Sequence, residues 1–155
     1  MQKNNSVWGV GPKIVTSTLV YLALTLYIDE IFHCFAIVSE KIFMLYFLSG
    51  ILITIGLVIW VIAARTIFMM YKLDSLYKGG LYSFCRHPLY ANFILILVPG
   101  LCLLTNSWIV FTTPFFMYLA FKYFIKEEEQ CLIKQFGKTY IEYKEKVNSI
   151  VPKFH

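Results

Sequence analysis

Two short polar stretches interrupt a chain that is otherwise largely apolar. The first, residues 80–90, reads Gly-Leu-Tyr-Ser-Phe-Cys-Arg-His-Pro-Leu-Tyr and sets Arg86 and His87 at the start of an apolar run. The second is the triplet of glutamates at 127–129. Almost everything between them is apolar, so a helical hairpin across a bilayer would return the second stretch to the side of the first. We predict that the two stretches meet and form the functional centre.

Arg86 and His87 carry side chains suited to an anionic or hydrogen-bonding ligand. The guanidinium of Arg offers a planar fork of donors that matches a carboxylate or a phosphate. A His side chain can hydrogen-bond, bind a ligand or move a proton near neutral pH. Pro88 suits the first position of a helix, where its missing N–H costs nothing. The alternative is structural, with an Arg that anchors a helix at the membrane surface beside a solvated His.

The three glutamates have the wrong sign for the end of a membrane helix, where cationic residues are favoured. We therefore expect them to open a new, amphipathic helix, where they could be no more than a solvated charge run. Successive helical residues point about 100° apart, so at most one or two of the carboxylates can face the hairpin. The functional interpretation is that Glu128 or Glu129 turns inward and binds hydroxyl or cationic groups beside Arg86 and His87.

The composition excludes an ordinary soluble domain. Of the 155 residues, 59% are hydrophobic and 15% are charged, with a mean hydropathy of +0.67, whereas soluble domains are about half apolar and a quarter charged. We predict an all-α fold, a polytopic membrane bundle in one domain over residues 1–155. The four cysteines show neither a disulfide framework nor metal-ligand spacing, so we expect no metal site. The polar N-terminus gives no sign of a cleavable signal peptide.

Uncharged runs predict about four transmembrane helices. The runs are residues 14–28, 42–64, 89–105 and 108–121. We expect the second to end at Arg65, with a mixed polar segment following it as far as Gly79. The first is short for a bilayer, and we place Asp29, Glu30 and His33 at the membrane surface.

Residues 126–147 form the longest polar segment of the chain. Their apolar and aromatic side chains recur at intervals of three or four residues, as on one face of a helix. This spacing predicts a C-terminal amphipathic helix, broken at Gly137. An aromatic face of this kind more often packs against protein than binds a ligand, so its Tyr140 and Tyr143 have a structural alternative.

The basic residues fix an expected orientation. Of the 14 Lys and Arg residues, only Lys41 would face the outside in a four-span arrangement. The positive-inside rule then places both termini and the functional centre in the cytoplasm. We expect an integral protein of a prokaryotic cell membrane, whose net charge of +5 reflects orientation and attraction to anionic lipid. No nucleic-acid partner is needed to explain it.

Two blocks of the chain resemble the signature of a known family. Gly80-Leu81-Tyr82 followed by Arg86-His87-Pro88-Leu89-Tyr90 is similar to the G-x-Y…R-H-P-x-Y signature of the membrane methyltransferases typified by isoprenylcysteine carboxyl methyltransferase. The stretch from Glu127 to Tyr143 is similar to that family's E-E-x-x-L…F-G-x-x-Y-x-x-Y block. The resemblance covers about residues 50–152. Two ordered blocks at hairpin spacing are more specific than either block alone.

The resemblance implies S-adenosylmethionine as cofactor, bound at the cytoplasmic end of the last two membrane helices under the C-terminal helix. The residues expected around it are Tyr82, Arg86, His87, Pro88, Tyr90, Glu128, Glu129 and Tyr140. Arg86 and Glu128 are expected to act in catalysis. The acceptor would be lipophilic, foremost a prenylcysteine-type carboxylate that enters from the lipid between helices. Because this nucleophile is already ionised, the step needs positioning and desolvation more than acid–base catalysis.

The sequence departs from the family pattern at two positions. Asn92 stands where a small residue, commonly Gly, follows the first block, and Phe124 stands where an Arg is common, with Lys122 or Lys126 as substitutes. A phospholipid amine or a small thiol is therefore an open alternative acceptor. Sterol reductases carry a similar R-H-P-x-Y block and bind a nicotinamide cofactor, although the glutamates and the Phe-Gly-x-x-Tyr stretch argue against a reductase. A non-enzymatic membrane scaffold is the remaining alternative.

Overall fold

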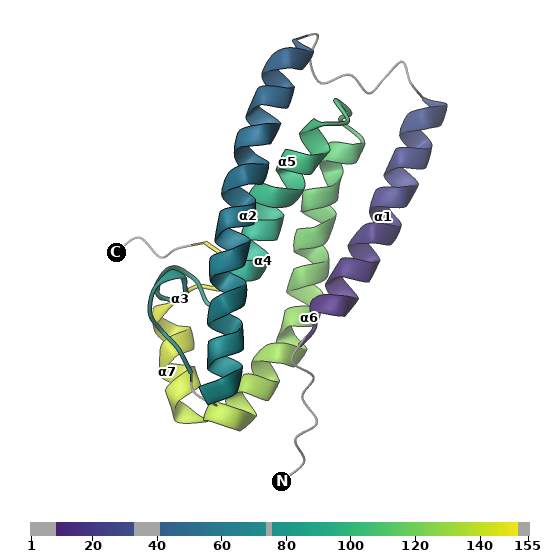
Figure 1. The fold of residues 1–155 in the computed structure, drawn as a ribbon. Helices are drawn as coiled ribbons and strands as arrows, with labels where there is room; N and C mark the ends of the chain where they lie inside the picture. The colour runs from purple at the N-terminus through teal and green to yellow at the C-terminus, as the bar shows by residue number, and fades with distance from the viewer. Residues whose placement is uncertain (1–8, 33–40, 74–75, 152–155) are drawn as a thin grey trace.

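The described part of the protein is built from helices. A computed structural model describes residues 9–32, 41–73 and 76–151 (Figure 1). The helices are α1 (Gly11–Ile31), α2 (Ile42–Leu73), α3 (Leu81–Phe84), α4 (Pro88–Asn92), the π-helical turn η1 (Phe93–Leu97), α5 (Val98–Leu103), the 3₁₀ turn η2 (Val110–Thr112), α6 (Thr113–Phe136) and α7 (Lys138–Lys146). The predicted all-α class is confirmed for these residues.

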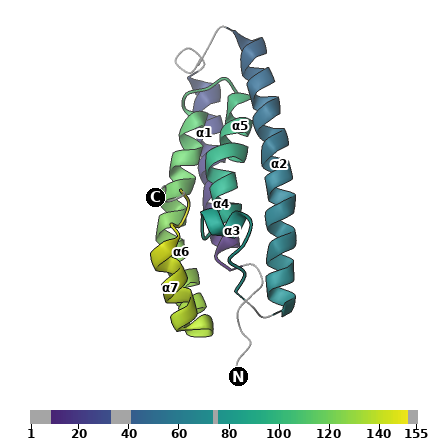
Figure 2. The same cartoon turned by 90° about the vertical axis from the view of Figure 1, so that its left-hand side faces the viewer.

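The long helices lie side by side. Helix α1 packs along α6, and α2 packs along α4, η1 and α5. Figure 2 shows α4 and α5 between α2 and α6. The short helices α3 and α7 gather at the same end of the bundle as the lower half of α6 (Figure 1). The two polar stretches of the sequence therefore lie at one end of the molecule.

Among the described residues, two helices are long and apolar enough to cross a membrane. They are Gly11–Ile31 and, within α2, Ile42–Met70. Only 17% and 11% of their most apolar windows are buried inside the protein, whereas the core helix of a soluble protein would be mostly buried. This exposed apolar surface is the pattern of a membrane protein. The helix Pro88–Leu103 is apolar but shorter, and the other two of the four predicted spans stay a prediction.

Small and polar side chains bring α2 close to α4 and α5. Ser49 Oγ donates to Gly100 O over 2.7 Å, and Asn92 Nδ2 donates to Gly56 O over 2.9 Å. Gly56 is buried, and a Cβ there would lie 2.9 Å from Leu97 Cδ1. Close backbone approach and interhelical hydrogen bonds of this kind are the usual means of helix association in lipid.

The helix that follows Pro88 is not regular. A π-helical turn occupies residues 93–97, and Val98 N–H donates to Phe93 O. Pro99 follows directly, and its ring excludes the normal bond to the carbonyl four residues earlier. The wider turn accommodates this proline inside the helix. The helix continues to Leu103, and its irregularity lies in the turn before Pro99.

Two predicted boundaries were wrong. Helix α2 does not end at Arg65 but continues to Leu73, because residues 66–73 retain helix-forming side chains and contain neither Gly nor Pro. The glutamates do not open a new helix either. They lie within α6, which runs unbroken from Thr113 to Phe136. The predicted break at Gly137 is confirmed, since Gly137 has φ of 54° and separates α6 from α7.

The acidic residues near the end of α1 lie inside its last turns. Glu30 is exposed, as expected of a surface residue. Asp29 is half-buried and accepts a hydrogen bond of 2.6 Å from Ser107 Oγ. Asp29 therefore ties α1 to the turn before η2. His33 lies outside the described residues.

Candidate functional site

The site is assembled from two chain segments that bend back on each other. Residues 85–87 form an extended link between α3 and α4, in which Arg86 N–H donates to Asn148 O and His87 N–H donates to Ser149 O. The positive φ of Gly137 turns the chain from α6 into α7, as a glycine without a Cβ does at low cost. Helix α7 can then return along α6, and the residues after it pair with the link that carries Arg86.

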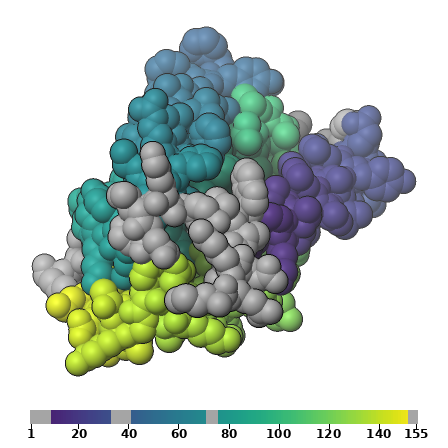
Figure 3. Space-filling view, turned by 60° about the horizontal axis from the view of Figure 1, so that its bottom comes forward, coloured from purple at the N-terminus to yellow at the C-terminus, as the bar shows by residue number. Residues whose placement is uncertain are grey.

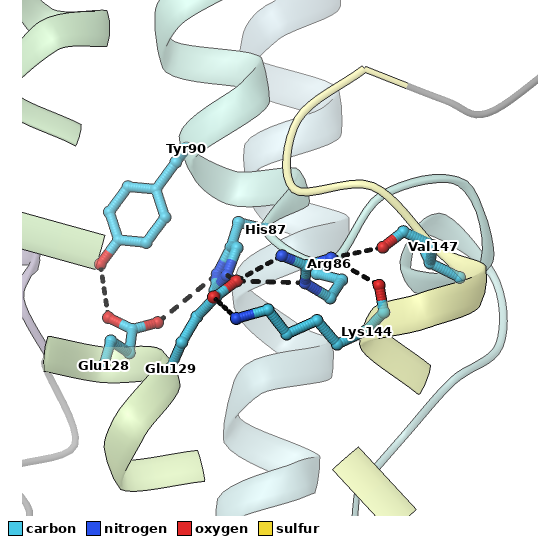
Figure 4. Close-up of polar contacts among 7 residues, drawn as sticks. All are labelled: Arg86, His87, Tyr90, Glu128, Glu129, Lys144 and Val147. Atoms are coloured by element: carbon cyan, nitrogen blue, oxygen red, sulfur yellow. Dashed lines mark hydrogen bonds and ion pairs between the residues drawn. The ribbon is translucent and has the colours of Figure 1, made fainter. Parts of the chain in front are cut away.

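Arg86 is held by three acceptors (Figure 4). Its Nη2 and Nε donate to Glu129 Oε1 over 2.5 and 3.2 Å. Its Nη1 donates to Lys144 O over 3.1 Å and to Val147 O over 2.5 Å. The side chain is 9% exposed. The guanidinium thus joins α6, α7 and the segment after α7 in one contact, which its fork of fixed donors makes possible.

Glu129 is the most enclosed of the three glutamates, with a side chain that is 11% exposed. Besides Arg86, it accepts from Lys144 Nζ over 2.6 Å. Burial by itself would raise the pKa of this carboxyl, but the neighbouring His87, Lys144 and Arg86 outweigh burial and hold the pKa well below its usual range. Glu129 is therefore ionised near neutral pH, at the centre of the contact.

His87 lies between two carboxylates (Figure 4). Its Nδ1 is 3.6 Å from Glu128 Oε1, and its Nε2 is 3.5 Å from Glu129 Oε1. The side chain is 5% exposed. We call Arg86, His87, Glu128, Glu129 and Lys144 the polar cluster. The charges of its two carboxylates are balanced in number by those of Arg86 and Lys144, and both of these cations contact Glu129.

Glu128 is the more open of the two carboxylates in the polar cluster, with a side chain that is 22% exposed against 11% for Glu129. Its Oε2 accepts from the Tyr90 hydroxyl over 3.0 Å and from the Val10 N–H over 3.1 Å. The rings of His87 and Tyr90 also contact Phe121, with ring centres 5.8 and 5.4 Å apart. The cluster therefore has an aromatic wall on the side that faces the membrane helices.

Three tyrosines pack beside Arg86. The Tyr143 hydroxyl donates to Tyr82 O, and burial, followed by the nearby Cys85, raises the pKa of Tyr143 to about 12. Burial and the neighbouring Tyr143 also raise the pKa of Tyr82. Tyr140 is 1% exposed, and burial and the nearby Glu129 raise its pKa. All three hydroxyls stay protonated near neutral pH and can act as donors.

The structure brings the predicted site residues together. Direct contacts link Arg86, His87 and Tyr90 with Glu128 and Glu129, so two of the three glutamates face the hairpin, within the predicted limit. The remaining predicted residues, Tyr82, Pro88 and Tyr140, are all buried beside them. The third glutamate, Glu127, is exposed and pairs with Lys13.

Sequence analysis missed three contributors to the site. Lys144 lies four residues after Tyr140, a spacing that puts both on one helical face, so its inward position could have been inferred. Val147 contributes only its carbonyl oxygen, and Val10 contributes only its N–H. A main-chain group leaves no trace in residue type, so no pattern in the sequence pointed to these two.

The two departures from the family pattern have separate consequences. Asn92 is 3% exposed and directs its amide to Gly56 O on α2, so it supplies an interhelical contact. Phe124 packs on the apolar core beside Phe121, with Lys13 Nζ 5.7 Å from its ring centre. Lys122 and Lys126 are both exposed, and Lys122 Nζ lies over the ring of Tyr118.

Fold and site together define a class of protein. It is an all-helical membrane protein with a semi-enclosed polar cluster at one end of its apolar helices, made of groups that hydrogen-bond and hold charge. Comparison with known sequences makes this more specific. The profile of the isoprenylcysteine carboxyl methyltransferase family matches residues 37–134, more than half of the chain. The chain belongs to this family.

Individual relatives agree with the family match. The chain is similar to the protein-S-isoprenylcysteine O-methyltransferase of Saccharomyces cerevisiae, with 38% identity over 80 residues, 50% of this chain and 32% of the yeast protein. It is 29% identical to that of Dictyostelium discoideum over 126 residues, 76% of this chain and 53% of the relative. For Xenopus laevis the identity is 36% over 83 residues, 52% and 29% of the two chains. The matched region thus spans between about a third and a half of these relatives.

Proposed function

We propose that this chain is an S-adenosylmethionine-dependent methyltransferase that methylates the carboxylate of a lipophilic, prenylcysteine-type acceptor. One observation carries the proposal. The Arg86-His87 pair and the Glu128-Glu129 pair, which belong to two separate signature blocks, are in contact at 2.5 to 3.6 Å. Family membership supports the activity, and the relatives named as protein-S-isoprenylcysteine O-methyltransferases support the acceptor.

The residues present fit such a cofactor. S-adenosylmethionine carries an amine, a carboxylate, ribose hydroxyls and a sulfonium, and so needs both acceptors and donors. Glu128 is an accessible carboxylate. The buried Tyr140 hydroxyl has no hydrogen-bond partner in the described part of the chain, and the buried His87 Nε2 makes no hydrogen bond there beyond its 3.5 Å ion-pair contact with Glu129 Oε1. Buried polar atoms are nearly always paired, so unpaired ones beside an open carboxylate suit a polar ligand.

Within this proposal the residues have different roles. Glu128 would accept from the amine or the ribose hydroxyls, and Tyr140 and His87 would complete the polar contacts. The rings of Tyr90 and Phe121 offer faces that favour a nearby cation. Arg86 is engaged with Glu129 and two carbonyls, so we assign it to positioning. That Arg86 also contacts the cofactor and acts in catalysis stays a prediction.

The chemistry asks little acid–base work of these residues. The cofactor supplies an electrophilic methyl group on its sulfonium. A carboxylate acceptor is ionised near neutral pH, so it can attack without a general base. The chain then contributes orientation and the exclusion of water. The charged Glu129 and the enclosed His87 contribute to orientation. The aromatic wall contributes to the exclusion of water.

We further propose that four helical segments span the membrane, with both termini and the polar cluster on the cytoplasmic side. The additional spans would be Pro88–Leu103 and the apolar first half of α6. The supporting observations are the distribution of Lys and Arg and the exposed apolar flanks of α1 and α2. An acceptor with a lipid tail could then reach the cluster from within the bilayer.

The decisive experiment is calorimetric titration of the detergent-purified protein with S-adenosylmethionine, S-adenosylhomocysteine and NADPH. We expect binding of the first two, lost in Glu128→Ala and retained in Glu127→Ala, which removes the exposed neighbour. Methyl transfer is then measured with a farnesylated cysteine, a phosphatidylethanolamine and a small thiol. Transfer to the lipid amine or the thiol alone would replace the proposed acceptor. Binding of NADPH alone would contradict the methyltransferase and favour a reductase.

A further inference from the structure

We propose that the turn Gly9–Val10, which precedes α1, positions the Glu128 carboxylate for the cofactor and completes the site. The inference rests on the proposed function and adds an element to it. Residues 9 and 10 lie outside the region matched by the family profile. Figure 3 views the bundle from the end at which the purple start of α1 and the yellow-green segment of α6 and α7 both appear.

The contact between the turn and Glu128 is direct. Val10 N–H donates to Glu128 Oε2 over 3.1 Å, and the Tyr90 hydroxyl donates to the same oxygen over 3.0 Å. Two donors on one oxygen fix the rotation of the carboxylate. Oε1 is then directed to the other side, 3.6 Å from His87 Nδ1. The turn and Tyr90 thus hold one oxygen, and the second is left facing the interior of the polar cluster.

The Glu128 carboxylate also stabilises the start of α1. The first N–H groups of a helix have no partner within it and carry a partial positive charge. Within the described residues, helix α1 has no side-chain cap of its own, and its first turn contains no acidic residue. Glu128, 118 residues away along the chain, supplies both the acceptor and the negative charge. The turn is anchored by Val10 and Ile14, which are 5% and 0% exposed in the apolar core.

Gly9 allows the close approach. Its φ is +51°, and a Cβ added to it would lie 2.5 Å from Glu128 Oε2 and 3.1 Å from Glu128 Cδ. These atoms form the end of a flexible side chain. A methyl group at position 9 would therefore push the carboxylate out of place without removing it and without displacing the backbone of α6. Gly9→Ala therefore changes the position of the Glu128 carboxylate, whereas Glu128→Ala removes it.

The chain offers a matched control close to the turn. Gly11 is two residues from Gly9, and its Cβ would lie 3.6 Å from the Tyr90 hydroxyl, an ordinary contact. Gly11→Ala therefore tests whether any added methyl near the start of α1 has an effect.

The test is calorimetric titration of S-adenosylhomocysteine into the full-length protein in detergent. Gly9→Ala should weaken binding roughly ten- to hundredfold, as the loss of a hydrogen bond to a charged group does. Gly11→Ala should bind like the wild-type protein. Gly9→Ala should still unfold in one cooperative thermal transition, which separates displacement of the carboxylate from misfolding. Protection of the Val10 amide from hydrogen exchange, followed by NMR, should be lost in Glu128→Ala.

The outcomes separate this inference from the proposed function. Wild-type affinity in Gly9→Ala, with binding by the wild-type protein intact, would overturn the positioning role alone. An equal loss in Gly11→Ala would do the same, because any methyl group added near the start of α1 would then explain the effect. Absence of binding by the folded wild-type protein would remove the proposed function, and the positioning role with it. An unprotected Val10 amide in the wild-type protein would refute the contact itself.

Discussion

Arg86 Nη2 lies 2.5 Å from Glu129 Oε1 and joins residues 43 positions apart in the chain. Both side chains are largely buried, at 9% and 11% exposed. The same guanidinium also bonds the main-chain carbonyls of Lys144 and Val147. This one ion pair therefore holds together the link before α4, the middle of α6 and the end of α7.

Loss of Arg86 should destabilise the protein. Arg86→Ala leaves Glu129 buried with one cation fewer, a change that typically costs about 3–5 kcal/mol of the free energy of unfolding. Arg86→Lys should restore only part of the lost stability, since an ammonium group lacks the planar fork of donors that bonds three acceptors at once. Thermal unfolding in detergent measures both. Arg65→Ala, at an exposed position, serves as the control. If Arg86→Ala were as stable as this control, the stabilising role of Arg86 would be refuted.

Stability should fall at acidic pH because of Glu129. Its pKa is lowered in the folded protein, so the folded state releases this proton more readily than the unfolded state. The stabilisation is therefore complete above the ordinary value of 4.5 and is lost progressively as the pH falls below it. Thermal unfolding between about pH 7 and pH 3.5 measures the slope. Glu129→Gln should flatten the profile, and Glu127→Gln should not; equal slopes in the two variants would contradict the assignment.

Tyr140 and Tyr143 should respond differently to loss of their hydroxyls. The Tyr143 hydroxyl donates to Tyr82 O, so Tyr143→Phe should reduce stability by about 1–3 kcal/mol through the carbonyl left unpaired. The Tyr140 hydroxyl has no partner within the described residues, so Tyr140→Phe should leave stability unchanged or raise it. If that hydroxyl serves the cofactor, Tyr140→Phe should instead weaken binding of S-adenosylhomocysteine. A stability loss without a binding loss would show that the hydroxyl serves the fold.

The two glycines within α2 should behave oppositely. A Cβ at Gly56 would lie 2.9 Å from Leu97 Cδ1 and 3.4 Å from Leu97 Cα, so Gly56→Ala should cost about 1–3 kcal/mol of stability by overpacking. A Cβ at Gly50 would meet nothing within 4 Å. Gly50→Ala should therefore be neutral or stabilising by up to about 1 kcal/mol, from helix propensity alone. Thermal unfolding of both variants in one detergent gives the comparison, and similar losses would argue against close packing of α2 on η1.

Composition and periodicity determined the class of this protein. A chain with 59% hydrophobic and 15% charged residues has far fewer charges than an ordinary soluble domain. Helical spacing marked the C-terminal amphipathic segment, and Gly137 marked its break. The two signature blocks determined that Arg86, His87, Glu128 and Glu129 belong together, because residue types with matching chemistry lay at the two ends of a hairpin.

Only the tertiary structure decided how these groups are paired. The negative charge of the glutamates suggested that they begin a new helix. Glu129 is instead tolerated within α6, because Arg86 and Lys144 neutralise its charge from other elements. The same holds for Val10 and Val147, whose contributions are a main-chain N–H and a main-chain carbonyl. Every residue but proline carries both groups. Their use depends on which segments meet in space, and no local pattern of side chains records that.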